Sequence, residues 1–423
     1  MSELPGGWTE TTLARLMDGG LFIDGDWVET KDQDEDGEVR LTQLADIGEG
    51  CWRNRSNRSM TRESAKRLGC TYLEKGDVLV ARMPDPLGRA CMFPGDPRQA
   101  VTVVDVCVMR PHPDNAIPSW LMWFFNAPPM RAKIAALQSG TTRKRISRKN
   151  LGCLTIPVPP IAEQQRIVEV IEEQFSHLDA AEASLTHVEH RANALAEAAY
   201  RAVRSPRWPF VKLSTIAKTS SGGTPSRRKA DNFCGTIPWI KSGELGDSHV
   251  RATAERISDT GLASSSAKLL KRGTLMMAMY GATVGKLGIL DLDSAATNQA
   301  VCAIEPHDAK LTPFLWLCLR AMRRDLIESA KGGAQPNISQ GMIRDLMIPM
   351  PSPDDRARLI SEIARQVSAC ERVAAAAVKG RLQIRRLRRA ILGIAFSGRL
   401  VSQRLGEDSG PPAKTVLGPA RAT

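Results

Sequence analysis

The sequence lacks the cysteine and histidine spacings that are typical of disulfide frameworks, metal sites and histidine bases. Its nine cysteines are an odd number and stand singly, and no two have the C-x-x-C spacing that brings two thiolates to one metal ion. Only six histidines are present, and no two are spaced as His-x-x-x-His. We therefore expect no metal site and no histidine base in this chain.

Signals for secretion and for membrane insertion are also missing. The first residues, Met1 to Pro5, lack the basic and apolar blocks of a signal peptide. No apolar run is long enough to span a bilayer. Together with the unpaired cysteines, these absences favour a reduced, cytoplasmic setting.

Two segments resemble catalytic loops but fail on their spacing. Residues 281–287, GATVGKL, have three residues between the glycines where a phosphate loop needs four, and leucine follows the lysine where a magnesium-binding hydroxyl belongs. Residues 126–130, NAPPM, resemble the Asn/Asp-Pro-Pro-aromatic motif of adenine methyltransferases, but an alanine interrupts it and no aromatic residue follows. We predict that the chain is not an enzyme and binds no cofactor itself.

Positive charge is what the sequence has in excess. The 423 residues include 58 Lys and Arg against 46 Asp and Glu, which gives a formal net charge of +12 and an isoelectric point near 9.4. Such an excess fits a polyanionic partner, of which nucleic acid is the commonest. A basic protein without such a partner is the alternative. The length exceeds that of one ordinary domain.

The chain also repeats itself. Residues 140–185 align with residues 332–377 at a constant shift of 192 positions. Further matches, after small changes of the shift, are residues 76–79 with residues 273–276 and Trp8 with Trp208. Self-similarity of this kind indicates a tandem duplication of about two hundred residues. Each diverged half consists of a globular module followed by a helix.

The helix of each half has the spacing of a coiled coil. Residues 161–205 contain no Gly or Pro, and their apolar residues recur in alternating steps of three and four. At a rise of 1.5 Å per residue, such a helix is roughly 65 Å long. A second pattern of similar length follows in the second half, with Gly380 near its middle. The predicted seam residues are Leu178, Leu185, Val188 and Leu195 in the first helix and Val373, Ile384, Leu387 and Ile391 in the second.

We expect the two helices to pair with each other in antiparallel orientation, because two apolar seams in one chain can satisfy one another. Separate packing of each helix on its own module is the alternative. The predicted segments are residues 1–158 for the first module, 159–205 for the first helix, 206–351 for the second module, 352–404 for the second helix and 405–423 for a disordered tail.

Both modules have the pattern of mixed α and β structure. Short apolar runs at residues 77–81, 101–109, 274–278 and 300–304 predict strands. Residues 119–126 and 314–322 predict helices.

Two loops at matching positions of the repeat carry different polar chemistry. Residues 141–149, TTRKRISRK, hold five cations, which can neutralise phosphates and grip a guanine edge. Residues 332–339, GGAQPNIS, offer amides, which pair with adenine. The difference favours two modules that recognise two different short DNA sequences. Solvated surface loops are the alternative.

Other polar loops supply further candidates for DNA contact. The second module opens with residues 220–229, SSGGTPSRRK, where glycines permit a tight backbone and three cations suit phosphate. The full candidate set is Arg53, Arg55, Arg58, Arg82, Thr142, Arg143, Lys144, Arg145, Arg148, Thr224, Ser226, Arg227, Arg228, Lys241, Tyr280, Asn298, Gln299, Gln335 and Asn337. The arginine-rich residues 381–389 of the second helix suit nearby DNA, an acidic partner or plain solvent.

In this order, the segments resemble the specificity subunits of type I restriction-modification systems. Residues 143–147 and 154–164, the latter LTIPVPPIAEQ, resemble the signature that follows a target-recognition domain. Residues 221–226, SGGTPS, resemble the start of such a domain, and residues 387–400 resemble the end of the second conserved helix. The resemblance extends from residue 8 to about residue 404. It departs at residues 352–356, SPDDR, and in the missing Gly-Gly-Thr-Pro opening of the first module.

The resemblance implies an α/β (α+β) fold with two target-recognition domains separated by two long antiparallel coiled-coil helices. It also implies an asymmetric bipartite DNA target and a scaffold for partner subunits. Two modification subunits would carry S-adenosylmethionine and methylate adenine, and two restriction subunits would use ATP and Mg to cut DNA. The rivals are a free-standing repressor, a fused methyltransferase-endonuclease and a specificity subunit without partners. A repressor normally obtains two half-sites from identical protomers, whereas these halves differ.

Overall fold

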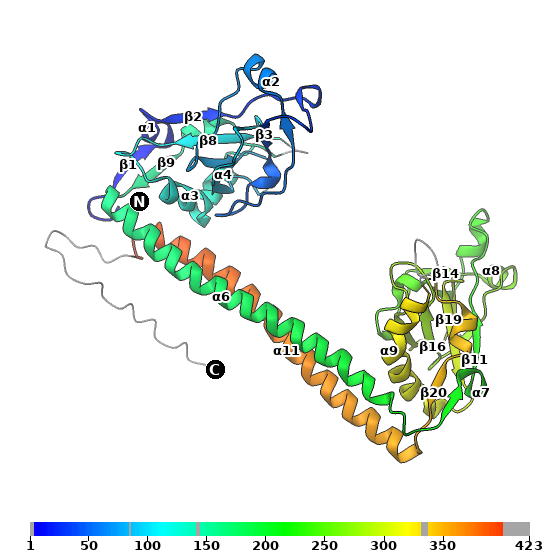
Figure 1. Ribbon diagram of the computed structural model, residues 1–423. Coiled ribbons are helices and arrows are strands. Elements are labelled where there is room, and N and C mark those ends of the chain that lie inside the picture. Colours follow the sequence, from blue (N-terminus) through cyan, green and yellow to red (C-terminus); the bar gives the residue numbers. More distant parts are fainter. Residues whose placement is uncertain (1–3, 84–85, 141–143, 331–336, 401–423) are drawn as a thin grey trace. The chain divides into compact units, whose positions relative to one another are not determined.

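The computed structural model describes residues 4–83, 86–140, 144–330 and 337–400 and divides into two compact units (Figure 1). One unit comprises Met1–Ser184 and Gly380–Thr423, and the other comprises Leu185–Lys379. Each unit contains one α/β module and parts of two long helices. No helix among the described residues has both the length and the apolar character needed to cross a membrane.

The first module is built on two small sheets and a strand pair. The four-stranded sheet has the order β2 (Leu21–Asp24), β8 (Val106–Arg110), β5 (Val78–Ala81) and β6 (Ala90–Met92). The three-stranded sheet has the order β4 (Ser59–Met60), β3 (Val39–Thr42) and β7 (Ala100–Thr102), with β3 parallel to β7. The strand pair is β1 (Thr9–Thr12) with β9 (Thr155–Val158).

The second module repeats this plan and adds two strands. Its first sheet has the order β11 (Ala217–Ser221), β19 (Val301–Pro306), β16 (Leu275–Ala278), β17 (Leu287–Leu290) and β13 (Ser248–Val250). Its second sheet has the order β14 (Glu255–Ile257), β12 (Ile237–Ile240), β18 (Ser294–Thr297) and β15 (Leu270–Lys271), with β12 parallel to β18. The strand pair is β10 (Phe210–Lys212) with β20 (Met347–Pro349).

The predicted duplication is confirmed down to individual hydrogen bonds. The Leu13 N–H donates to the carbonyl of Leu154 at 2.9 Å, and the Leu213 N–H donates to the carbonyl of Leu346 at 2.8 Å. Two equivalent serines cap the short helices α5 (Arg148–Gly152) and α10 (Gln340–Arg344), because the hydroxyl of Ser147 or Ser339 accepts an N–H of the first turn. The two halves therefore fold by the same local rules.

The predicted strands and helices of the modules are present, with one difference. The run at residues 101–109 forms two strands instead of one, because β7 ends at Thr102 and β8 begins at Val106. A turn joins them, in which the Val106 N–H donates to the Val103 carbonyl at 2.9 Å, so the chain passes from one sheet to the other. The helical runs form α3 (Pro118–Asn126), followed by α4 (Pro128–Ala136), and α9 (Thr312–Ser329).

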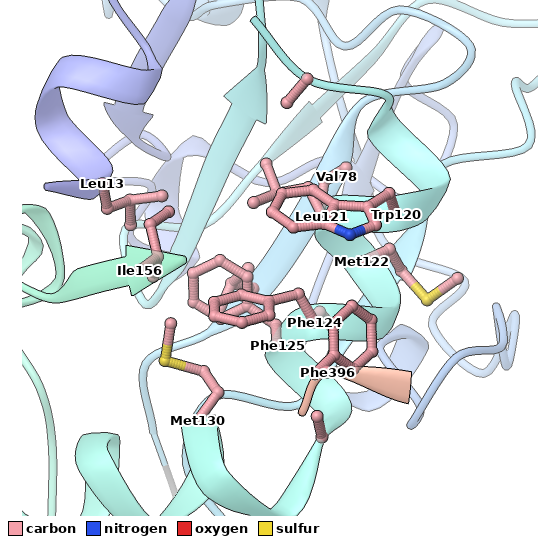
Figure 2. Close-up of a cluster of buried hydrophobic side chains, with 14 of the residues drawn as sticks. Leu13, Val78, Trp120, Leu121, Met122, Phe124, Phe125, Met130, Ile156 and Phe396 are labelled. Carbon is pink, nitrogen blue, oxygen red and sulfur yellow. The ribbon is translucent and has the colours of Figure 1, made fainter. Parts of the chain in front are cut away.

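The core of the first module includes the end of the last helix (Figure 2). Helix α11 (Pro353–Ala395) leads into Phe396, whose ring centroid lies 5.3 Å from that of Phe124 and 6.1 Å from that of Trp120. Trp120 and Phe124 stack on each other with centroids 5.3 Å apart. The core of the first module therefore combines residues from the start of the chain with Phe396, which follows more than two hundred residues after α6 (Ile161–Tyr200) begins.

The two long helices run antiparallel within each unit. In the first unit, Phe175 of α6 (Ile161–Tyr200) lies in the same core as Leu392 of α11, and Arg388 pairs with Asp179 at 2.5 Å. In the second unit, Tyr200 at the end of α6 shares a core with Ile363 near the start of α11. Early residues of one helix therefore lie with late residues of the other. A supercoil between them stays a prediction.

The predicted seam residues differ in burial. Leu178, Leu185 and Ile391 are half-buried and Ile384 is buried. By contrast, Val188, Leu195, Val373 and Leu387 are 41%, 55%, 47% and 51% exposed. The intermediate seam positions lie one residue later, at half-buried residues such as Glu182, Glu189 and Arg388. A prediction based on apolar residues does not find these charged positions, so half of the predicted seam residues lie on the more exposed side of each helix.

The proline-rich signature anchors the start of α6 to the first module. The buried carboxylate of Glu163 accepts the indole N–H of Trp8 at 3.0 Å, and the buried amide oxygen of Gln164 accepts the Ile117 N–H at 2.8 Å. In the second half, residues 352–356 differ from the family pattern, and they begin helix α11 in a different way. There the Ser352 hydroxyl accepts the Asp355 N–H at 3.2 Å and donates to the Asp355 carboxylate at 2.8 Å.

Replacing Phe396 by alanine tests whether the end of α11 belongs to the first core. We expect Phe396→Ala to lower the free energy of unfolding by about 3 kcal/mol, because it leaves a cavity between two buried rings. Leu387→Ala is the matched control on the same helix, and its effect should stay within about 0.5 kcal/mol at this exposed position. Urea denaturation measures both. Equal effects of the two substitutions would contradict the described register.

Candidate nucleic-acid interface

In the second module, four candidate segments that are distant in sequence meet at the end of β16. The Met279 N–H donates to the Ala300 carbonyl at 2.8 Å, and the Met279 carbonyl accepts the Ile338 N–H at 2.8 Å. The Asn298 N–H donates to the Ile240 carbonyl at 3.0 Å. These bonds bring together the segments that carry Lys241, Tyr280, Asn298, Gln299 and Asn337.

The first module has the equivalent arrangement at the end of β5. The Arg82 N–H donates to the Asp105 carbonyl at 2.9 Å, and the Arg82 carbonyl accepts the Ile146 N–H at 3.1 Å. Ser139 and Arg145 exchange two backbone hydrogen bonds of 2.9 Å, which holds the base of the basic loop. Three of the predicted DNA contacts, Thr142, Arg143 and Gln335, lie outside the described residues.

A second cation-rich loop of the first module is fixed by a buried carboxylate. Asp46 is fully buried, and its side chain accepts the N–H groups of Gln43, Arg55 and Ser56 at 2.7–2.8 Å. Asp46 also lies 3.6 Å from the guanidinium of Arg40. The backbone of the loop at residues 53–58 is therefore held firmly, and this loop carries three candidate arginines.

Five candidate cations of the first module are exposed. Their side chains form no hydrogen bond or ion pair with another described residue, so they are available to a partner. These cations are Arg53, Arg55, Arg58, Lys144 and Arg145.

Arg82 and Arg148 are both held by groups of the first module itself. The Arg82 side chain is only 15% exposed, donates to the carbonyls of Ile146 and Val104, and lies 3.2 Å from the carboxylate of Asp24. Arg148 donates to the Phe22 carbonyl at 2.7 Å and lies 3.5 Å from the same carboxylate. Both arginines bind groups within the module, although the Arg148 side chain is still 44% exposed, and their contact with DNA stays a prediction.

The glycine-rich opening of the second module lies against the strand β18. A Cβ atom on Gly222 would stand 2.2 Å from the Thr297 carbonyl oxygen, and one on Gly223 would stand 2.4 Å from the Ala267 nitrogen. Only glycine permits this approach. It places the exposed Thr224 hydroxyl within hydrogen-bond reach of the Gln299 amide. Ser226 and Arg228 are exposed in the same loop.

The two remaining cations of the second module share one carboxylate. Lys241 Nζ lies 2.6 Å from Glu255 Oε1, and Arg227 Nη2 lies 2.8 Å from Glu255 Oε2. The hydrogen bond from Lys241 and then that from Arg227 lower the pKa of Glu255 below its ordinary value. Glu255 is therefore ionised at neutral pH, and the trio carries a net positive charge.

The structure also locates an opening loop in the first module, which the sequence analysis missed. A Cβ on Gly25 would stand 2.3 Å from the Val103 carbonyl oxygen, as one on Gly222 would from Thr297. Gly25 ends β2 as Gly222 ends β11, and Trp27 then stands in the place of Thr224 with 70% of its surface exposed. The alignment of the two halves could have located this loop, because a shift of 197 positions aligns Gly76 with Gly273 and also Gly25 with Gly222.

The fold and the site together define a class of protein: a tandem duplicate of one α/β module, each copy joined to a long helix and presenting its own polar surface. The sequence model of the type I restriction modification DNA specificity domain matches residues 7–189 and 206–374, and the chain belongs to this family. Among the described residues, no group of three or more His, Cys, Asp or Glu side chains is placed to hold a metal ion.

Relatives of known name are specificity subunits of type I restriction enzymes. The EcoR124I/EcoR124II specificity subunit of Escherichia coli is 26% identical over 153 residues, 35% of this chain and 38% of the relative. The MjaIX specificity subunit of Methanocaldococcus jannaschii is 22% identical over 162 residues, 37% of each chain. The EcoBI specificity subunit of Escherichia coli is 21% identical over 330 residues, 68% of this chain and 67% of the relative. The chain thus spans well under half the length of the first two.

Two solved structures share the fold. The HsdS subunit from Thermoanaerobacter tengcongensis has a TM-score of 0.56 at 18% identity and covers 94% of this chain, with 98% of its own length matched. A chain from a structure on the assembly and conformational transition of the type I R-M system has a TM-score of 0.74 at 19% identity, with 95% and 100% covered. At these identities the likeness concerns the fold alone.

Replacing Asp46 tests whether this carboxylate fixes the arginine-bearing loop. We expect Asp46→Ala to lower the free energy of unfolding by about 3 kcal/mol, because it leaves a buried arginine without its full set of partners. The amides of Arg55 and Ser56 should also exchange their hydrogens faster. Asp34→Ala is the control, since Asp34 is exposed and its side chain accepts a single backbone N–H. Unchanged exchange at Arg55 and Ser56 in Asp46→Ala would refute the role of Asp46.

Proposed function

We propose that this chain is the DNA-specificity subunit of a type I restriction-modification complex and that it is not itself catalytic. In this proposal each module recognises one half of an asymmetric bipartite DNA target. One observation carries the proposal: next to equivalent backbone hydrogen bonds, from Ile146 to Arg82 and from Ile338 to Met279, the first module has Arg145 and the second has Asn337. Membership of the DNA specificity family supports it.

The difference between the modules is a difference in hydrogen-bonding chemistry. The first module offers the guanidinium and ammonium groups of Arg53, Arg145 and Lys144, which suit phosphates and guanine. The second offers the amide of Asn337 at the position equivalent to Arg145, and the amide of Gln299 on a neighbouring segment, and amides suit adenine. Two such surfaces recognise different half-sites, so the target is asymmetric. A homodimeric repressor would present two identical surfaces instead.

The long helices support a fixed distance between the two half-sites. Helix α6 has 40 residues and helix α11 has 43, so each is about 60 Å long at 1.5 Å per residue. Half-sites on one face of a duplex must be separated by about one helical turn or a multiple of it. A rigid spacer meets this requirement, and a flexible one does not.

Apolar side chains that are exposed on both helices support the proposal that partner subunits bind there. They are Leu382, Leu387 and Ile394 in the first unit, and Val188, Leu195, Val373 and Val378 in the second. In the proposal these side chains contribute to the interfaces with partner subunits. In the proposal two modification subunits and two restriction subunits assemble with the chain, and S-adenosylmethionine, ATP and Mg bind to those subunits.

Selection of DNA from a random-sequence pool tests the proposal directly. The tagged full chain, purified from its host with the subunits bound to it, should enrich duplexes that carry two different short motifs at a constant separation. In the proposal the two long helices set the separation, and the two surfaces set the difference between the motifs. Enrichment of a palindrome, or of no motif at all, would contradict the proposal.

The salt dependence of binding tests the exposed cations of the first module. If Arg145 contacts a phosphate, Arg145→Ala should make the negative slope of log affinity against log salt concentration shallower by about 0.9. The loss of affinity should be the same on all sequences. Arg324→Ala is the matched control, because Arg324 is exposed on α9 and pairs with Glu328 at 2.8 Å. A slope that is unchanged for Arg145→Ala, or changed equally for Arg324→Ala, would remove Arg145 from the interface.

A further inference from the structure

Arg227 has a more ordered environment than the other candidate cations of its loop. Its guanidinium carbon lies 4.7 Å from the ring centroid of Phe233 and 5.6 Å from that of Trp239. Its Nη2 donates to Glu255 at 2.8 Å. The side chain nevertheless remains 58% exposed. The group is thus held by aromatic rings and by a carboxylate while much of it still meets solvent.

The residues that hold Arg227 are themselves fixed by the fold. Glu255 stands opposite Trp239 in the antiparallel pair β12–β14, so backbone hydrogen bonds set their separation. The indole N–H of Trp239 donates to the Gly223 carbonyl at 3.1 Å, and the ring of Phe233 packs edge-on against Trp239 with centroids 5.7 Å apart. The second oxygen of Glu255 accepts from Lys241, which prevents the carboxylate from turning away.

Preorganisation of this kind favours a contact with a base edge over a contact with phosphate. A planar guanidinium with two N–H groups side by side matches the O6 and N7 acceptors of guanine in the major groove. Such a match needs a defined orientation, whereas a phosphate accepts charge from many directions. An arginine that is already ordered also loses less side-chain freedom when it binds.

Neighbouring cations lack these features. Arg228 is exposed, and its side chain forms no hydrogen bond or ion pair with another described residue. In the first module, Arg148 comes nearest to this arrangement, since it lies 3.5 Å from Asp24 and 5.9 Å from the ring centroid of Phe22, but it is less exposed, at 44%, and donates to the Phe22 carbonyl. Among the candidate cations of the described chain, Arg227 alone combines a carboxylate, aromatic stacking and an exposed fraction above one half.

We infer that Arg227 is a specificity-determining residue of the second module, that it donates two hydrogen bonds to a guanine in the second half-site, and that Glu255 is its positioning residue. The inference rests on the proposed function and deepens it by naming the residue and the base. Arg228 is assigned a phosphate contact, which contributes affinity without sequence preference.

The test compares Arg227→Ala with Arg228→Ala, since the two substitutions remove the same charge from adjacent exposed positions. The probe is the selected target duplex of the unsubstituted full chain in its complex, together with duplexes in which each base pair is changed in turn. Arg227→Ala should reduce the preference for guanine at one position of the second half-site by about tenfold or more, and leave the first half-site unchanged. Arg228→Ala should weaken binding equally on every duplex.

Glu255→Gln tests the positioning role separately. It should reduce the preference at the same base pair and leave the preference at the other positions and the melting temperature unchanged. The inference is overturned if Arg227→Ala weakens all duplexes equally, as a phosphate contact would, or leaves every base preference intact, as a structural ion pair would. If the unsubstituted complex shows no base preference, the proposed function fails as well.

Discussion

The burial of helix ends in the module cores is the constraint on which the rest of this structure depends. Phe396 completes the core around Trp120 and Phe124, so the last turn of α11 is part of the first module. Tyr200 joins the core that contains Ile363, so the last turn of α6 is part of the second module. Each module core therefore includes the last turn of one of the long helices.

Two carboxylates of the first module, Asp24 and Asp46, affect whether nearby arginines are available to a partner. Asp24 lies close to the guanidinium groups of Arg82 and Arg148, which also donate to backbone carbonyls. Asp46 instead binds backbone N–H groups and the buried Arg40, and the arginines of its loop stay exposed. A carboxylate can thus either pair with a candidate cation or position the loop that carries one. A net charge of +12 does not show this distinction, which appears only when each charge is placed.

Much of the fold was predictable from the sequence because it rests on local patterns. The apolar runs at residues 77–81 and 274–278 form β5 and β16, and the constant shift revealed the duplication. Half of the predicted seam residues are exposed, and charged residues such as Glu182, Glu189 and Arg388 are half-buried one position later, where apolar periodicity does not point. The inward turn of Arg82 depends on carbonyls from distant segments, which no spacing rule reveals. The opening loop at Gly25 could have been predicted from the sequence, since the repeat aligns Gly25 with Gly222.

The central claim is that two unlike modules on one spacer recognise one asymmetric target, and methylation in the host tests it most directly. Sequencing that detects methylated adenine should be applied to the genome with and without this gene. The account predicts that a bipartite, asymmetric methyladenine motif with a fixed gap disappears when the gene is deleted. An unchanged pattern of methylation would contradict it.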